Sequence, residues 1–243
     1  TFSFVTPQQS QMFMPHGLEA VGVYDERRGG EPTLRPSAIA SLLRCRKANL
    51  DARNEQPGGL RLYEIAAAYA QLEGKRQTVE HRNLSMLMDV PGVAPGKQPK
   101  QEQLQFAVRQ LRGAVEALAA ALAGPEAAVA VTPCARSSDA WADDAHGQVT
   151  INGAHVGVLG VTSADALRLF DLDIPVVAAD LSVEALCANF PPKAFAHALP
   201  AFPGIERDLS LVVAEQMAWA DVAAAVAAEP LEHFEDFDFV GTY

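Results

Sequence analysis

The chain has 243 residues, of which 49% are hydrophobic and 20% are charged, a composition typical of a folded protein with one large domain or two modest ones. Its 30 acidic residues against 19 lysines and arginines give a formal net charge of −11, which disfavours binding of nucleic-acid phosphates by the chain as a whole. No apolar run reaches the ~18 residues of a membrane span, and the opening residues lack the basic and apolar regions of a signal peptide.

The basic residues and cysteines bear on local charge and on the expected location of the chain. Four basic residues lie close together and leave a local basic patch open: Arg44, Arg46, Lys47 and Arg53. The three cysteines are Cys45, Cys134 and Cys187. Because they are widely spaced and odd in number, they match neither a metal site nor a disulfide framework, and we expect a reducing, cytoplasmic location.

The first hundred residues predict short strands around one helix. In chain order these are a strand at 1–6, a helical turn after Pro7, a strand at 19–26, a helix at 37–51, and strands at 60–71 and 82–90. The helix follows from apolar residues that recur at helical spacing, namely Ile39, Leu42, Leu43 and Leu50. In the segment 60–71, aromatic and β-branched residues favour a strand, although the alanines after Ile65 leave a helix open.

The clearest helix covers residues 101–124. Its apolar stripe alternates steps of four and three residues: Leu104, Val108, Leu111, Val115, Leu118 and Leu122. Gly124-Pro125 is a strong stop signal for this helix. A strand is predicted at 127–133, and the polar, acidic segment 137–147 is predicted to be a loop.

A β-hairpin is predicted around Asn152-Gly153, because Asn-Gly between two alternating apolar runs is a strong signal for a two-residue turn. Short helices follow Ser163 and Ser182, whose hydroxyls can cap them, and a strand at 175–181 lies between these helices. This mixture of hairpins and helices predicts an α+β fold with a largely antiparallel sheet.

The proline-rich segment 190–203 is the predicted boundary between a domain at 1–200 and a second one at 201–243. After it, the sequence predicts a strand at 205–213, a helix at 218–228 and a strand-like segment at 233–243. A domain that starts so late has too few residues to be complete, so we expect the chain to be a piece of a longer protein.

The sequence predicts no catalytic, cofactor-binding or metal-binding residues. Two acidic clusters are interpreted as solvated surface: Asp143, Asp144 and His146, and Glu235, Asp236 and Asp238. The six histidines lack the spacing of zinc sites, and the chain has neither a glycine-rich phosphate loop nor a nucleophile elbow. Cys134 has no partner histidine that the sequence identifies, so we interpret it as an inert thiol.

Several segments resemble the phenylalanyl-tRNA synthetase β subunit family. The stretch FPGIERDLSLVV resembles the opening of that family's ferredoxin-fold anticodon-binding domain, through Phe202, Pro203, Ile205, Arg207, Asp208, Leu209, Leu211, Val212 and Val213. The last residues, 237–243, resemble the second strand of the same domain. Earlier segments resemble successive signatures of the family's catalytic-like module, in the same order: 3–5, 34–43, 61–69 and 152–160. Ala66 stands where the family pattern has glycine.

This resemblance implies a class II aminoacyl-tRNA synthetase-like domain at 1–200, with an antiparallel sheet flanked by helices, and an incomplete ferredoxin-fold anticodon-binding domain at 201–243. Active class II sites need arginines that grip ATP. Neither Arg61 before Glu64 nor Arg168 matches those motifs well. The resemblance therefore implies a catalytically silent segment with no cofactor of its own, while ATP and magnesium serve the whole phenylalanine-tRNA ligase.

The implied role is assembly. In this family, α and β subunits form an α2β2 heterotetramer in which the α subunit is catalytic, tRNA is contacted through the complete β subunit, and no membrane takes part. The helix at 37–51 is the implied counterpart of an interface helix, and we hypothesise that its apolar side chains contribute to the subunit interface: Ile39, Leu42, Leu43 and Leu50. Packing of these side chains against the chain's own sheet is the alternative.

Two other functions compete with this interpretation. One is a stand-alone class II-like ligase that activates an amino acid with ATP, and the missing arginine motifs argue against it. The other is a tRNA-binding module, for which the net charge of −11 predicts weak binding.

Overall fold

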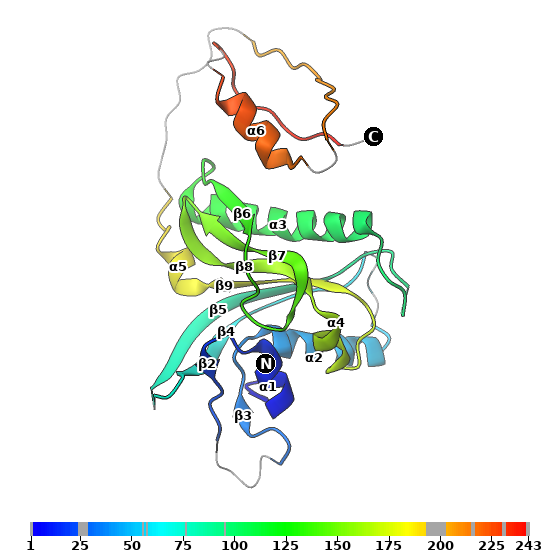
Figure 1. Cartoon of the computed structure of the whole chain (residues 1–243), viewed down its shortest axis with the longest axis vertical. Coiled ribbons are helices and arrows are strands. Elements are labelled where there is room, and N and C mark those ends of the chain that lie inside the picture. The colour runs from blue at the N-terminus through cyan, green and yellow to red at the C-terminus, as the bar shows by residue number, and fades with distance from the viewer. Residues whose placement is uncertain are drawn as a thin grey trace. The chain divides into compact units, whose positions relative to one another are not determined.

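The computed structural model describes residues 2–23, 29–54, 56, 58–75, 77–94, 96–192, 203–214, 217–229 and 232–241 (Figure 1). The chain divides into two compact units, Thr1–Phe195 and Ala196–Tyr243, which are described separately. The predicted boundary after residue 200 lies in the segment 193–202, outside the described residues, and it stays a prediction. Among the described helices, none is both long and apolar enough to cross a membrane.

The first unit is built on a seven-stranded sheet in which every neighbouring pair is antiparallel. Its strands, from one edge to the other, are β2 (Leu18–Glu19), β4 (Arg61–Leu72), β5 (Thr78–Asp89), β9 (Val176–Ser182), β8 (Ala154–Thr162), β7 (Trp141–Ile151) and β6 (Val129–Pro133). A second, two-stranded sheet pairs β1 (Phe4–Val5) with β3 (Thr33–Leu34). The predicted α+β class with an antiparallel sheet is confirmed.

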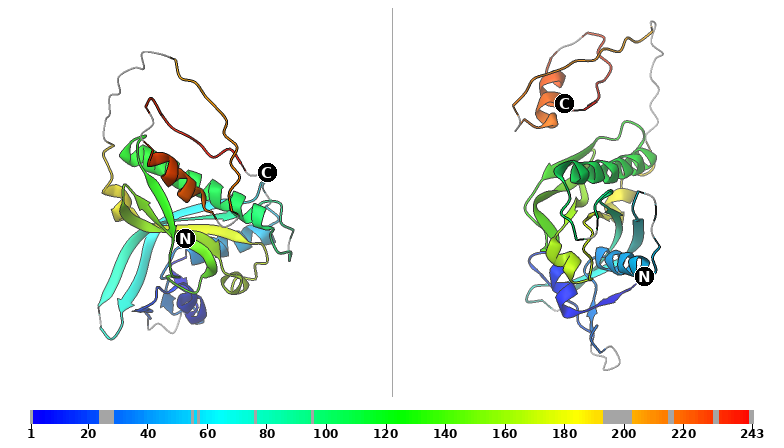
Figure 2. Two further views of the ribbon diagram at one scale, coloured as in Figure 1. Left: turned by 45° about the horizontal axis from the view of Figure 1, so that its top comes forward. Right: turned by 90° about the vertical axis from the view of Figure 1, so that its right-hand side faces the viewer.

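Helices cover both faces of the large sheet, as the two turned views in Figure 2 show. One face carries α1 (Pro7–Phe13), α2 (Ile39–Asp51) and α4 (Ala164–Arg168), and the other carries α3 (Gln101–Ala123) and α5 (Val183–Cys187). We call them the α2 face and the α3 face. Because successive strand residues point to opposite faces, Val176 and Ala178 of β9 pack into the core on the α2 face, while Val177 and Ala179 pack into the core on the α3 face.

The hairpin and the helix caps form as the local sequence predicts. Strands β7 and β8 are joined at Asn152-Gly153, where both residues have positive φ, at 52° and 81°, as a type I′ turn requires. The Ser163 hydroxyl accepts a hydrogen bond from the Ala166 amide at the start of α4. Ser182 caps α5 in the same way.

The predicted loop at 137–147 is wrong from Trp141 onward, because β7 begins at that residue. The pairing of β7 with β8 shifts register between Trp141 and His146, and Asp144 within that interval has a φ of 53°. Such a bulge breaks the two-residue alternation by which a strand is recognised in sequence. The acidic side chains of Asp143 and Asp144 remain exposed, as expected for a polar segment.

Other differences concern which residues are buried and where strands end. Strand β4 covers the predicted segment 60–71 from Arg61 onward, so the alternative of a helix over its alanines is wrong. The strand expected at 19–26 is reduced to β2 and an isolated bridge at Gly22, and residues 24–28 lie outside the described residues. In α3, the buried residues are Ala107, Leu111, Val115, Ala119 and Ala123, while the other predicted stripe residues are partly buried. Small alanine side chains let the helix lie close to the sheet.

The second unit contains α6 (Trp219–Ala227), which confirms the helix predicted at 218–228. The strands predicted at 205–213 and 233–243 are wrong for the described residues, since 203–214 and 232–241 form neither helix nor strand. Apolar side chains of the first segment are exposed, Ile205 by 77% and Leu209 by 78%. Strand propensity alone does not hold a strand without neighbours to pair with, so the ferredoxin-like arrangement is not confirmed.

Candidate functional site

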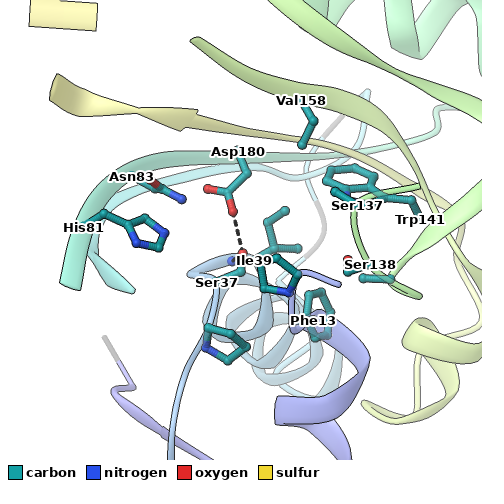
Figure 3. A pocket seen from close by; sticks show the side chains of 13 residues that line it. Phe13, Ser37, Ile39, His81, Asn83, Ser137, Ser138, Trp141, Val158 and Asp180 are labelled. Atoms are coloured by element: carbon teal, nitrogen blue, oxygen red, sulfur yellow. Dashed lines mark hydrogen bonds between the residues drawn. The ribbon is translucent and has the colours of Figure 1, made fainter. Parts of the chain in front are cut away.

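A small hollow lies on the α2 face of the sheet, beside Asp180 of β9 (Figure 3). Its wall combines Ser37, which lies just before α2, the β5 residues His81 and Asn83, and Trp141 at the start of β7. These segments are far apart in sequence and meet because β5 and β8 both pair with β9, while α2 packs over the same face. In this hollow, polar side chains converge on a titratable group, Asp180.

Asp180 is held by two serine hydroxyls. Ser85 donates to Oδ1 at 2.7 Å, and Ser37 donates to Oδ2 at 2.8 Å. The Ser37 oxygen also accepts a hydrogen bond from the Ile39 amide at 3.1 Å, so this hydroxyl links the first turn of α2 to the sheet. Burial of the carboxyl raises the pKa of Asp180, although the residue as a whole is only half-buried; hydrogen bonds from Ser85, Ser37 and Asn83 offset part of this rise.

The size and lining of the hollow limit what it can hold. Its volume is about 70 Å³, which admits a few water molecules, whereas pockets for drug-sized ligands measure about 300–1,000 Å³. The described lining offers a carboxyl, hydroxyls and an imidazole but includes no arginine or lysine. Phosphate groups are held in proteins by such cations or by backbone amides at helix starts.

The residues that came nearest to class II motifs do not meet at this hollow. Arg61 and Glu64 are three residues apart on β4, so they point to opposite faces of the sheet. Glu64 binds Arg35, whose Nη1 lies 2.8 Å from Oε1, and both side chains are largely buried, 2% and 12% exposed. Arg168 of α4 is 73% exposed and pairs with Asp165.

Arg35 connects several segments of the first unit through hydrogen bonds. Beyond Glu64, its guanidinium donates to the Phe2 carbonyl at 3.1 Å, the Ala67 carbonyl at 3.1 Å and the Ser41 hydroxyl at 2.6 Å. These groups belong to the first described residues, to β4 and to α2. Glu64 therefore holds the fold together through Arg35.

The predicted basic patch is mostly neutralised. Arg46 is buried, and its Nε lies 2.7 Å from Oδ1 of Asp89, whose other oxygen accepts from the Leu60 amide. Arg44 pairs with Glu31, and Lys47 pairs with Asp51 at 2.5 Å. Three of the four basic residues thus have acidic partners within the chain.

The four side chains of the interface hypothesis lie on α2. Ile39, Leu42 and Leu43 are 2%, 3% and 0% exposed and pack in the core on the α2 face, and Leu50 packs partly buried against it. This burial supports the alternative explanation, packing against the chain's own sheet. The interface hypothesis itself is untested by these contacts and stays a prediction.

A second, open hollow of about 510 Å³ lies beside the start of β7 and is lined by charged residues. Arg136 lies 3.0 Å from Asp143, and Arg168 pairs with Asp165. Each arginine of this wall thus has an acidic partner within the chain, and exposed pairs of this kind contribute little to stability. We interpret this hollow as solvated surface.

The predicted acidic clusters behave differently from each other. Asp143 and Asp144 are exposed, whereas His146 points inward, with Nε2 at 3.2 Å from the Ala135 carbonyl and 3.5 Å from Cys134 Sγ. Glu235, Asp236 and Asp238 of the second unit are not gathered into a metal site. No group of three potential metal ligands occurs anywhere in the described part of the chain.

Sequence reasoning missed the Asp180 network. One signal was available: Asp180 is a charged residue inside the apolar run VVAADL, where burial requires hydrogen-bond partners. The partners Ser37 and Ser85 are 143 and 95 residues away, so the sequence could not name them.

The chain is similar to known proteins over most of its length. A family described as "Phenylalanyl tRNA synthetase beta chain CLM domain" matches residues 1–183. Two phenylalanine–tRNA ligase beta subunits are similar to it: that of Rhodopirellula baltica, 29% identical over all of this chain and 34% of the relative, and that of Xylella fastidiosa strain Temecula1, 28% identical over 80% of this chain and 23% of the relative.

Among solved structures, a pyrrolysyl tRNA synthetase from Desulfitobacterium hafniense aligns over 76% of this chain and 59% of its own length, with 12% identity and a TM-score of 0.49. That likeness is too weak to support a conclusion. The chain spans about a third or less of the curated relatives named above. Because the family match covers residues 1–183, more than half of the sequence, the chain belongs to the family of the phenylalanyl-tRNA synthetase beta chain CLM domain.

Proposed function

We propose that this chain is a non-catalytic segment of the β subunit of phenylalanine-tRNA ligase, which supports assembly with the catalytic α subunit and so the aminoacylation of tRNA with phenylalanine. The family match over residues 1–183 supports the parent enzyme. The size and lining of the Asp180 hollow support the proposal that the segment is non-catalytic. A volume of about 70 Å³ is too small for a nucleotide, and the described lining offers no arginine or lysine to the phosphates of ATP.

The proposal includes the partners of the whole enzyme. An α2β2 heterotetramer in the cytoplasm would use ATP and magnesium on the α subunit, and tRNA would be contacted through the complete β subunit. We assign residues 201–243 to an incomplete ferredoxin-fold anticodon-binding domain, supported by the sequence pattern at 202–213. This last assignment rests on sequence.

We place the contact with the α subunit on strand β4. Tyr63 and Ile65 are 75% and 61% exposed, and their cross-strand partners Met86 and Leu84 lie on the α3 face. On its outer side, β4 pairs with a described strand only at Gln71–Leu72, through β2. The edge also bonds to Arg35 at Ala67 and Tyr69, so its open part lies beside Tyr63 and Ile65. An exposed apolar surface beside an open part of a strand edge is suited to protein association.

Co-elution with the α subunit of the same organism in size-exclusion chromatography tests this proposal. The double variant Tyr63→Glu/Ile65→Glu should lose co-elution, whereas Phe190→Glu, which adds a charge of the same sign at a side chain 63% exposed, should keep it. Substituting lysine for Leu42 and Leu43 would not test an interface on α2, because both side chains are buried in the core and the charges would unfold the chain. Failure of the unmodified, folded chain to co-elute would contradict the assembly role, and a folded double variant that still co-elutes would exclude β4.

A further inference from the structure

Cys134 and His146 are brought together by the pairing of β6 with β7. The last paired residues of β6 and its partner are Pro133 and Gly147. One step further along this register, Cys134 lies opposite His146, with Sγ 3.5 Å from Nε2. The sequence offered no partner for this cysteine, and the sheet register supplies one twelve residues away.

His146 is held in one orientation. Its ring stacks on Trp141, with the ring centroids 6.0 Å apart and the planes 13° from parallel. The strand beside it makes room for this side chain, since a Cβ added to Gly160 would come within 2.3 Å of the His146 Cβ. With 8% of the residue exposed, the imidazole is a fixed part of the fold.

The hydrogen bonds of His146 fix which nitrogen carries the proton. The Ala135 carbonyl, 3.2 Å from Nε2, can only accept, so we assign the hydrogen to Nε2. Nδ1 is buried and has no hydrogen-bond partner among the described residues. The same Nε2–H is shared with Cys134 Sγ, which makes the sulfur an acceptor.

We propose that Cys134 is a thiol-modification site that takes small disulfides and soft electrophiles, with His146 as its positioning residue. The reacting species is the thiolate, and a hydrogen bond is stronger when its acceptor carries charge. After the thiol gives its proton to a base in solution, the sulfur attacks one sulfur of a disulfide. A bond forms between Cys134 and that sulfur, and the old sulfur–sulfur bond breaks. The departing thiolate takes the electron pair, so Cys134 is oxidised and half of the disulfide is reduced.

The other cysteines provide internal references. Cys187 is exposed and Cys45 is half-buried, and no imidazole contact with either occurs among the described interactions. Exposure alone would make Cys187 react fastest, whereas the imidazole contact predicts that Cys134 reacts fastest despite being less exposed. This inference is independent of the proposed function.

Peptide-resolved mass spectrometry of the full chain tests it, with iodoacetamide and oxidised glutathione as probes at pH 7. We expect Cys134 to react about ten- to a hundredfold faster than Cys187, the scale of one hydrogen bond to a charged group. His146→Phe keeps a ring against Trp141 without the N–H and should abolish the faster reaction of Cys134. His146→Gln offers an N–H donor of another shape and should retain part of the rate difference between Cys134 and Cys187.

Two results would overturn the inference. One is a Cys134 rate at or below that of Cys187 in the unmodified chain, a result that needs no variant to fold. The other is an unchanged ratio of the two rates in a His146→Phe chain whose circular dichroism matches the parent. Rates measured in denaturant should converge for all three cysteines, which shows that any difference arises from the fold.

Discussion

Replacing Glu64 with alanine should lower the free energy of unfolding by about 3–5 kcal/mol, because it leaves the buried Arg35 cation without its counter-charge. Arg35 is 2% exposed at its side chain and Glu64 is 12% exposed, so water does not replace the lost carboxylate. The three other acceptors of Arg35 are neutral groups, on Phe2, Ser41 and Ala67. They satisfy its hydrogen bonds but do not balance its charge.

Thermal unfolding followed by circular dichroism measures this effect. For a chain of this length, 3–5 kcal/mol corresponds to a fall in Tm of about 6–20 °C. The matched control is Asp165→Ala, which removes the partner of Arg168 in a pair that is 65% and 73% exposed. That control should change stability by less than about 1 kcal/mol.

The comparison of the two variants decides what Glu64 does. A similar, small shift in Tm for both would refute the structural role of the Arg35–Glu64 pair. Glu64→Gln should fall between the parent and the alanine variant, because it keeps an acceptor for Arg35 and removes only the charge.

Three further predictions concern Asp180, Leu43 and Gly160. Burial raises the pKa of Asp180 above 3.8, so the folded chain binds this proton more tightly than the unfolded chain, and stability falls as pH rises from 3.8 through the folded pKa. Asp180→Asn should remove that fall in stability. Urea unfolding at several pH values measures it, and a difference in the free energy of unfolding between the two chains that does not change with pH would contradict the prediction. Leu43→Ala, at a site with 0% exposure, should cost about 2–5 kcal/mol in the same urea assay, and a cost below 1 kcal/mol would contradict its core position. Gly160→Ala should destabilise the hairpin, since its Cβ would meet that of His146 at 2.3 Å; an unchanged Tm would contradict the packing.

Local signals in the sequence predicted local structure well. The turn at Asn152-Gly153 and the helices capped by Ser163 and Ser182 depend on residues within a few positions of each other, and all three are confirmed. The start of β7 at Trp141 was missed because a register shift interrupts the alternation from which a strand is predicted.

Contacts between distant residues could not be predicted in this way. Arg35 and Glu64 are 29 residues apart, and Ser37 and Asp180 are 143 residues apart, so only the assembled sheet brings them together. Burial has the same origin: the helical spacing of Leu42 and Leu43 predicts an apolar stripe, but it does not say whether a subunit or the chain's own sheet covers that stripe.

The measurement that tests the central claim most directly is phenylalanine-dependent exchange of pyrophosphate into ATP. The chain alone should show no exchange above background, because the described lining of the Asp180 hollow holds no arginine or lysine for the phosphates. The α subunit assembled with its complete β subunit is the positive control and should show exchange under the same conditions. Exchange by the purified chain alone, at a rate that rises with phenylalanine concentration, would contradict the non-catalytic role.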